Sequence, residues 1–262
     1  MFVNVKKNTK YFSFFVILLT FNLFISCKTT NNYQVTKIKG EIIGITNEKG
    51  ENENISTFLK PYKEKIKKDL DSVLAYCPET LDKSNGKWQT TIGNLLAKVV
   101  FEAGNPIFQK RENKTIDFCM LNHGGIRAII PKGNVTTRNA YEVMAFENTL
   151  FIVGLKGNKV KELANYILKE KKPHPLYGIQ IFANKDNLTV NKIEVNGKPI
   201  IDDQLYYVAT SDYLSNGGDN MVFFKESNIK FDINYKLRDI LIDYFKKVDT
   251  IEVITNERII LE

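Results

Sequence analysis

Two glycine-containing loops hold the residues of this sequence that are best suited to contacting a small ligand. The first loop runs from Asn122 through Gly124 and Gly125 to Arg127. Adjacent glycines let backbone N–H groups approach a ligand closely, Asn122 both donates and accepts hydrogen bonds, and the planar guanidinium of Arg127 suits phosphate. The spacing alone fits a Gly-Gly turn followed by a surface arginine equally well.

The second loop adds an aromatic ring to the same kinds of group. Tyr213 precedes Gly217 by four residues, and Asp219 follows directly after Gly218. A tyrosine face stacks on a base with a gain of roughly 1–3 kcal/mol, and a carboxylate accepts hydrogen bonds from ribose. The alternative is a loop whose Asn and Asp side chains cap local turns. Phe146 is a third candidate, although composition alone favours a core position for a lone phenylalanine there.

Cysteine and histidine residues give no sign of a metal site. Cys77 and Cys119 are far apart, and no Cys-x-x-Cys or Cys/His ligand spacing occurs. In an exported domain these two cysteines form either a disulfide or two buried thiols. We interpret His123 as a loop side chain without a metal role, and His174, between two prolines, as a structural residue in an exposed loop. We therefore expect no metal and no cofactor to be bound by this chain.

Strands and helices that must position the loops are mixed, without regular βαβ alternation. Periodicity predicts helices over 56–70, 92–103, 157–168 and 235–248, with Gly104 as the stop signal of the second. Strand-like runs cover 35–46, 72–77, 115–121, 149–155, 179–182, 189–195, 206–210, 251–255 and 258–261. This mixture predicts an α+β fold.

The first 27 residues have the layout of an export signal. A basic segment precedes the apolar residues 11–26, which are few for a membrane span, and Cys27 follows. Residues 23–27 resemble a bacterial lipobox, in which Cys27 carries the lipid; an uncleaved anchor or a cut elsewhere is the alternative. The sequence thus predicts a signal peptide over 1–27, a polar tether over 28–36 and a folded domain over 37–262, lipid-anchored in a bacterial cell envelope.

Net charge gives little support for a nucleic-acid partner. The chain has 37 Lys and Arg against 30 Asp and Glu, or +7. Three of the lysines lie in the signal segment, so the rest has 34 against 30, or +4. The lysines are scattered over predicted helix faces, which is typical of a solvated surface.

Six short motifs occur in an order that resembles one known family. They are Gly93-Asn94-Leu95, Asn122 to Arg127, Gly133-Asn134-Val135-Thr136, Phe146, Leu155-Lys156-Gly157 and Tyr213 to Asp219. Their order and spacing resemble the C-terminal domain of the 5'-nucleotidase and UDP-sugar hydrolase family over roughly residues 85–262. The resemblance implies that family's layered α/β/β/α fold.

The resemblance also implies roles for individual residues. A base would lie between the rings of Phe146 and Tyr213, with Asn122 on the base and Asp219 on the ribose. Arg127, with the backbone of Gly124 nearby, would hold phosphate or ribose oxygens.

Some positions depart from the family pattern. Ala145 replaces the usual proline before Phe146. Lys87 and Gln89 stand where an arginine and an acid are usual, which puts a phosphate contact there in doubt because lysine is a point charge rather than a fork.

Family members also carry a metal-binding domain with D-x-H and GN-H-[ED] motifs, which this sequence lacks. We therefore expect a nucleotide- or nucleoside-binding specificity domain of an exported 5'-nucleotidase, inactive alone, for nucleotide catabolism. A separate metallophosphatase subunit would supply two divalent metals. The alternative is a lipoprotein that binds nucleotides without hydrolysis, and a degenerate remnant is a third reading.

Overall fold

The computed structural model describes residues 8–23 and 34–262, and the chain divides into two units, Met1–Asn52 and Glu53–Glu262. In the first unit, helix α1 covers Asn8–Leu23, and a 3-10 turn, η1, covers Asn47–Lys49. No helix within the described ranges is long and apolar enough to cross a membrane. Cys27 and most of the predicted tether lie outside the described residues.

The strand predicted over 35–46 is wrong. These residues are exposed and form no regular structure. Alternating apolar residues favour a strand only where a neighbouring strand pairs with the backbone and covers one face. The second compact unit begins at Glu53, after these residues.

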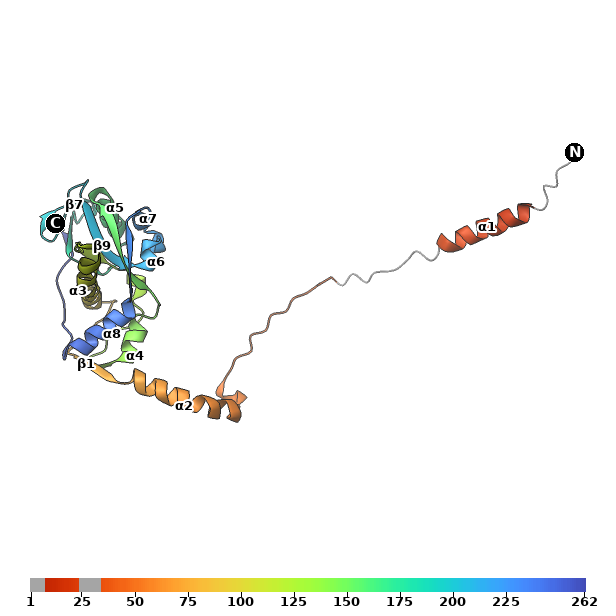
Figure 1. Ribbon diagram of the computed structural model, residues 1–262, viewed down its shortest axis with the longest axis horizontal. Coiled ribbons are helices and arrows are strands. Elements are labelled where there is room, and N and C mark those ends of the chain that lie inside the picture. Colours follow the sequence, from red (N-terminus) through yellow and green to blue (C-terminus); the bar gives the residue numbers. More distant parts are fainter. Residues whose placement is uncertain (1–7, 24–33) are drawn as a thin grey trace. The chain divides into compact units, whose positions relative to one another are not determined.

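A five-stranded sheet forms the centre of the second unit (Figure 1). Its strands, in spatial order, are β10 (Lys230–Lys236), β4 (Thr149–Lys156), β9 (Leu205–Ser211), β2 (Phe118–Met120) and β5 (Leu176–Tyr177). Strands β2 and β9 run parallel, with Phe118 opposite Val208 and Cys119 opposite Ala209, while the other neighbours are antiparallel. The parallel pair brings the loops that follow β2 and β9 to the same edge of the sheet.

Two smaller sheets complete the strand structure. One contains β11 (Ile259–Leu261), β6 (Ile179–Ala183), β7 (Val190–Val195) and β8 (Lys198–Pro199), in that order. The other pairs β1 (Val73–Cys77) with β3 (Gly133–Thr136).

Helices cover both faces of the central sheet, because its strands are apolar on both sides. On one face, Leu150 and Ile152 of β4 belong to the core that contains α3 (Thr91–Glu112) and α8 (Leu237–Lys247). On the other, Val153 and Leu155 pack in the core of α5 (Gly157–Glu170) and the four-stranded sheet. The predicted α+β fold is confirmed.

Helix α3 continues past Gly104, so the predicted stop there is wrong. A Cβ at Gly104 would lie 2.7 Å from Leu150 Cδ2 and 3.2 Å from Ile116 Cδ1. The glycine therefore allows the helix to pack closely on the sheet. The helix ends at Glu112, where Asn113 adopts the left-handed conformation (φ 54°) and donates its N–H to Gln109 O.

The remaining helices are α2 (Glu53–Leu70), α4 (Thr137–Val143), α6 (Asp212–Ser215) and α7 (Val222–Lys225). The end of α2 is tied to α4, because the guanidinium of Arg138 donates to Asp71 Oδ1 over 2.8 Å and the Thr137 N–H donates to Ser72 O over 3.4 Å. Helix α4 and strands β3 and β10 were not predicted, and Tyr235, the predicted start of the last helix, belongs to β10.

The strand predicted over 251–255 is also wrong, although its apolar residues are buried. Ile251 and Ile254 enter the core, while residues 251–255 form no strand or bridge. The one isolated bridge nearby joins the preceding residue, Thr250, to Tyr76. The two cysteines of this unit, Cys77 and Cys119, are buried free thiols.

Candidate functional site

The loop after β2 is shaped by two glycines that surround the side chain of Asn122. The N–H of Gly125 donates to Asn122 O over 3.1 Å, which closes a 3-10 turn, η2, over His123–Gly125. A Cβ at Gly125 would lie 2.8 Å from Asn122 Oδ1. The absence of a side chain at this position therefore lets the Asn122 amide fold back over its own loop.

The loop after β9 fixes the ring of Tyr213 in the same way. Helix α6 begins there, with the Ser211 hydroxyl accepting from the Leu214 N–H over 3.1 Å. Gly217 has a φ of +89°, which turns the chain back toward the helix. A Cβ at Gly218 would lie 2.4 Å from Tyr213 Cε1, so the tyrosine ring rests directly on the Gly218 backbone.

Asp219 connects the two loops. Its carboxylate accepts a hydrogen bond from Asn122 Nδ2 over 2.7 Å and another from the Tyr213 hydroxyl over 2.8 Å. Its backbone carbonyl accepts from the Tyr166 hydroxyl over 2.7 Å. Because an ionised carboxylate only accepts, the amide of Asn122 must present its nitrogen to Asp219 and keeps its oxygen for other contacts.

The two tyrosines at Asp219 both have raised pKa values, for different reasons. The hydrogen bond to the Asp219 carboxylate raises the pKa of the Tyr213 hydroxyl. Burial raises the pKa of Tyr166 to about 12, with smaller contributions from Glu170 and Asp219. Both hydroxyls therefore stay protonated at neutral pH and act as donors to Asp219.

Phe146 and Arg127 lie against each other. Phe146 is 50% exposed, so the core position that composition favoured is wrong. The guanidinium carbon of Arg127 lies 5.7 Å from the centre of the Phe146 ring, and its Nη1 donates to Gly124 O over 3.3 Å. Arg127 forms none of the ion pairs found among the described residues.

These groups line one cleft of about 400 Å³. The cleft contains all six residues predicted as ligand contacts: Asn122, Gly124, Arg127, Phe146, Tyr213 and Asp219. Gly125, the second of the two adjacent glycines, also lines it, as does Asn148, which was not predicted. The volume lies within the range of about 300–1,000 Å³ that small-molecule sites occupy.

The two histidines are not among the residues that line the cleft. His174 is 2% exposed, so the exposed loop predicted for it is wrong. Its Nδ1 accepts the N–H of His123 over 3.3 Å, and burial lowers its pKa to about 4. Burial also lowers the pKa of His123. Within residues 8–23 and 34–262, no three His, Cys, Asp or Glu side chains are grouped as metal ligands would be.

Residues near the predicted GNL motif hold the C-terminal segment in place. Asn94 Nδ2 donates to Ile254 O over 3.1 Å and to Asn256 O over 3.0 Å. Gln89 Oε1 accepts the N–H groups of Arg258 and Ile259, each over 3.2 Å. These bonds explain both the buried Asn94 and the position of the 251–255 segment.

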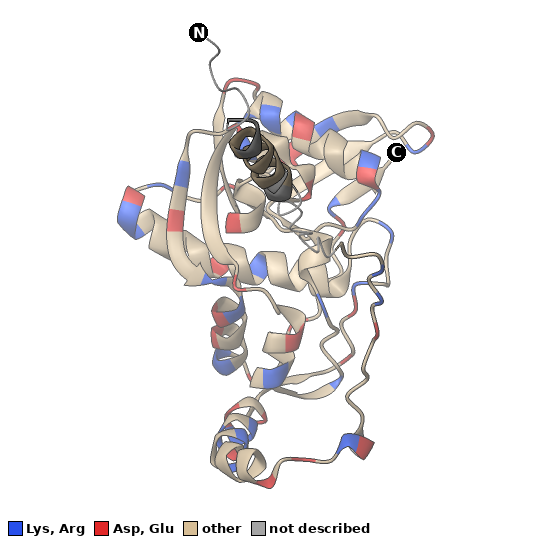
Figure 2. Ribbon diagram, turned by 90° about the vertical axis from the view of Figure 1, so that its right-hand side faces the viewer, with Lys and Arg blue, Asp and Glu red and all other residues tan. Residues whose placement is uncertain are grey.

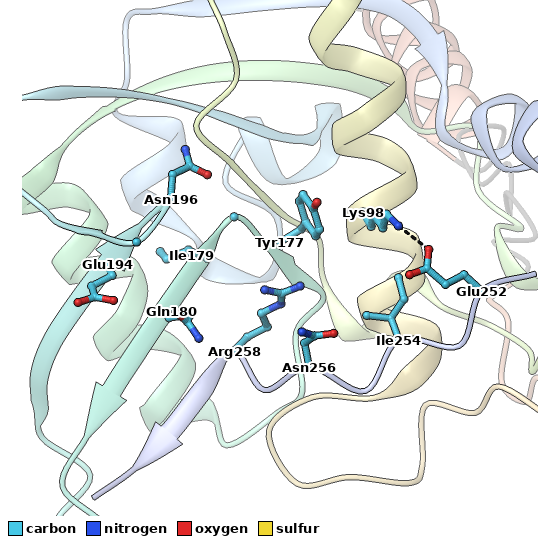
Figure 3. Close-up of a pocket in the computed structure, with 12 residues that line it drawn as sticks. Lys98, Tyr177, Ile179, Gln180, Glu194, Asn196, Glu252, Ile254, Asn256 and Arg258 are labelled. Atoms are coloured by element: carbon cyan, nitrogen blue, oxygen red, sulfur yellow. Dashed lines mark hydrogen bonds and ion pairs between the residues drawn. The ribbon is translucent and has the colours of Figure 1, made fainter.

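A second hollow, of about 440 Å³, lies beside this C-terminal segment (Figure 3). The ammonium of Lys98 pairs with Glu252 there, and the guanidinium of Arg258 lies 5.2 Å from the centre of the Tyr177 ring. It contains none of the six predicted residues. Its cationic groups thus contact groups of the protein itself, and its size alone does not make it the better candidate.

Fold and cleft together define an α+β domain with a cleft of small-molecule size beside the ends of two parallel strands. A family model for the 5'-nucleotidase C-terminal domain matches residues 73–226. The chain therefore belongs to the 5'-nucleotidase C-terminal domain family.

Individual relatives agree with this assignment. Protein UshA of Yersinia enterocolitica is 26% identical over 183 residues, covering 68% of this chain and 32% of the relative. The NAD 5'-nucleotidase of Haemophilus influenzae is 32% identical over 134 residues, or 43% of this chain and 22% of the relative. The chain thus spans about a third or less of the length of these relatives.

Solved structures share the fold. The 5'-nucleotidase precursor of Thermus thermophilus gives a TM-score of 0.65 at 24% identity and covers 85% of this chain and 46% of its own. The NAD nucleotidase of Haemophilus influenzae gives 0.61 at 20% identity, with 80% and 41% covered.

Proposed function

We propose that the cleft binds a nucleotide or nucleoside, with the base held between Phe146 and Tyr213. The observation that carries this proposal is the meeting of two half-exposed aromatic rings, an amide, a carboxylate and an arginine in one cleft. A base offers two π faces and polar edges, while ribose and phosphate offer hydroxyls and negative charge. The two rings match the faces of the base, and Asn122 matches its polar edge. Asp219 matches the ribose hydroxyls, and Arg127 matches the negative charge of the phosphate.

The polar residues retain the capacity that these roles require. Asp219 accepts one bond at each carboxylate oxygen, and each oxygen has a second lone-pair site that a ribose hydroxyl can use. Asn122 keeps its carbonyl oxygen and one N–H for the edge of a base. Among the described residues, the Arg127 side chain is held by a ring contact and one bond to the Gly124 carbonyl, so it can turn toward an anionic group at little cost.

At the level of the whole protein, we propose a specificity domain of an exported 5'-nucleotidase that acts with a dinuclear metallophosphatase partner. Relatives named as 5'-nucleotidases extend well beyond the matched region, which supports a division of labour between this domain and another. The two divalent metals of the partner would activate water and stabilise phosphoryl charge. The residues described above would bind and orient the nucleotide.

For localisation, we propose that the chain is exported and held in a bacterial cell envelope by a lipid on Cys27. The basic segment, the apolar run over 11–26 and the small residue before Cys27 support this proposal. Metabolic labelling with a radioactive fatty acid tests it. Label in the intact chain that is lost in Cys27→Ser is the expected result, and equal labelling of both contradicts lipid attachment at Cys27.

Calorimetric titration of the unit Glu53–Glu262 tests the binding proposal. This unit contains both hydrophobic cores of the described chain. We expect micromolar binding of at least one of AMP, adenosine and UDP-glucose. Phe146→Ala and Tyr213→Ala are each expected to weaken it about tenfold or more, since base stacking is worth roughly 1–3 kcal/mol.

Matched controls are available on helix α2, where Phe58 and Tyr62 are exposed to similar extents but lie outside the cleft. Phe58→Ala and Tyr62→Ala are expected to leave the affinity unchanged. If no ligand binds, or if all four variants weaken binding alike, the cleft is not the nucleotide site. A phosphate-release assay with Mn²⁺ is added, and release by this unit alone contradicts the requirement for a catalytic partner.

A further inference from the structure

Helix α2 has an apolar stripe that no other part of its unit covers. Phe58, Leu59, Tyr62 and Ile66 recur at spacings of three and four, which places them on one side of the helix. Phe58 is 67% exposed, and Tyr62 and Ile66 are each 57% exposed. The helix contains no buried residue. We call these four side chains the α2 stripe.

Lysines border the stripe on both sides. At 3.6 residues per turn, Lys63 lies roughly 80° to one side of the stripe and Lys65 roughly 80° to the other. Lys60, Lys67 and Lys68 lie farther round, so the helix has five lysines against Glu53, Glu64 and Asp69. Figure 2 shows these charges in blue and red on α2, the lowest helix in the view. None of the five lysines forms an ion pair within the part of the chain that the structure describes.

We propose that α2 lies on an anionic lipid surface, with the stripe inserted between the headgroups and the bordering lysines at the phosphates. A helix with an apolar face, aromatic residues on that face and lysines around it is the usual form of an interfacial helix. The long lysine stems extend along the apolar boundary while their ammonium groups reach the headgroups. Each lysine near an anionic surface adds about a fivefold increase in binding.

A lipid surface fits this stripe better than a protein partner does. Stable protein interfaces take roughly 20–30 residues from each side, whereas the stripe consists of four side chains on one helix. An interfacial helix needs only one apolar face. The Phe58 and Tyr62 rings also contact each other, with centres 5.6 Å apart, so they form a continuous apolar surface rather than separate knobs.

The end of helix α2 is tied to the rest of its unit. The ion pair between Arg138 and Asp71 ties the end of the helix to α4, and the residues after α4 include Phe146 of the cleft. A helix held at the membrane would therefore keep the rest of this unit close to the same surface. This inference is independent of which ligand the cleft takes.

Vesicle binding by the unit Glu53–Glu262 tests the proposal. Tyr62→Trp serves as the reporter, because the one native tryptophan, Trp88, is 6% exposed and its emission stays constant. We expect a blue shift with vesicles of phosphatidylglycerol and phosphatidylcholine at 0.1 M salt, and at least tenfold weaker partition onto phosphatidylcholine alone. Sedimentation with the same vesicles measures the partition of variants without the reporter.

Three variants decide the outcome in sedimentation. Phe58→Gln with Ile66→Gln removes apolar area without lowering helix propensity and is expected to reduce binding to background. Lys63→Gln with Lys65→Gln is expected to reduce binding to anionic vesicles about 25-fold, since each lysine contributes about fivefold. Phe146→Gln, in the cleft, is expected to leave the partition onto vesicles unchanged. Circular dichroism checks that the helix content of all three variants equals that of the parent.

Two results would overturn the proposal. One is an absence of binding to anionic vesicles by the unit with intact α2. The other is binding that persists in the Phe58→Gln, Ile66→Gln variant, which would place the lipid contact elsewhere. A third result would point to a protein partner. If the parent does not bind vesicles, and Phe58→Gln with Ile66→Gln weakens binding to a metallophosphatase, the stripe is a protein-docking face and the lipid proposal is wrong.

Discussion

Two pairs of exposed Phe and Tyr residues occupy very different surroundings in this protein. Phe146 and Tyr213 line a cleft with Asn122, Arg127 and Asp219, whereas Phe58 and Tyr62 stand on an open helix face between lysines. The exposed fractions are similar, at 50% and 45% for the first pair and 67% and 57% for the second. Exposure of an aromatic ring therefore does not identify its partner; the groups around the ring do.

The pairs also differ in how firmly their tyrosines are held. Tyr213 rests on the Gly218 backbone, and its hydroxyl both donates to the Asp219 carboxylate and accepts the Asp219 N–H over 3.1 Å. Tyr62 contacts the neighbouring Phe58 ring on a helix face without buried residues. A ring fixed in advance loses little entropy on binding a defined ligand. A fluid lipid surface requires no such fixed geometry.

The largest effect that separates the two regions is expected from acid. Burial holds the pKa of His174 at about 4, against an ordinary value near 6.5. Between pH 6.5 and pH 4, the unfolded chain therefore takes up a proton at His174 that the folded chain does not. The free energy of unfolding keeps its full value above pH 6.5 and falls by about 3 kcal/mol as the pH reaches 4. Urea unfolding at pH 7.5, 6, 5 and 4 measures this loss.

His174→Asn is the matched variant, because an Asn oxygen can accept the His123 N–H in place of Nδ1. Its stability is expected to vary less with pH than that of the parent. Near pH 4, where the folded protein itself begins to protonate His174, nucleotide affinity should fall before vesicle binding does, because His174 supports the loop that begins at Asn122 and the α2 stripe contains no histidine. Parallel pH profiles for the parent and His174→Asn would show that His174 is not the titrating group.

The next largest effect comes from testing all four aromatic residues in both assays. Phe146→Ala and Tyr213→Ala are expected to lower nucleotide affinity tenfold to a hundredfold each, from roughly 1–3 kcal/mol of stacking, with vesicle binding unchanged. Phe58→Ala and Tyr62→Ala are expected to show the reverse pattern. Calorimetry and vesicle sedimentation measure the two quantities. A variant that lowers both would show that the two surfaces are coupled, and the comparison would fail.

The residues that line the cleft could be predicted from the sequence, but the pairing of the two loops that carry them could not. All six predicted contacts meet in one cleft, yet nothing local in the sequence pairs the loop at Asn122 with the loop at Tyr213, nearly a hundred residues later. They meet because β2 and β9 are parallel neighbours. Parallel pairing depends on long-range packing, which apolar periodicity does not encode.

Several local signals were overridden by tertiary contacts. Gly104 looked like a helix stop, but the sheet packs against it and the helix continues. Residues 251–255 are rich in strand formers, but the Asn94 amide donates to the backbone carbonyls of Ile254 and Asn256. No local pattern indicated a role for Tyr166, because its hydrogen bond joins two segments 53 residues apart.

A smaller effect is expected from Gly218→Ala, which tests whether fixing the ring matters. The new Cβ would lie 2.4 Å from Tyr213 Cε1, so the ring must move off the loop backbone. We expect about a tenfold loss of nucleotide affinity, within the range for stacking on one ring, and unchanged vesicle binding. Tyr213→Phe is the comparison variant, since it keeps the ring position and removes the hydroxyl. Equal affinity of Gly218→Ala and the parent would show that the ring position is not set by this contact.

The smallest effect is expected from Tyr166→Phe, which removes one hydroxyl beneath the cleft. This hydroxyl donates to the Asp219 carbonyl, and Asp219 adopts the left-handed conformation with a φ of 52°. The ring itself stays packed near His174 and Phe223, with centres 5.8 Å away in each case.

Loss of the Tyr166 hydrogen bond costs about 1 kcal/mol, and most of this should appear as lower stability toward urea. Nucleotide affinity should fall only a few-fold, because Asn122 and Tyr213 still hold the Asp219 carboxylate. A loss of affinity as large as that in Tyr213→Ala would instead place the control of the cleft in the buried support of Asp219.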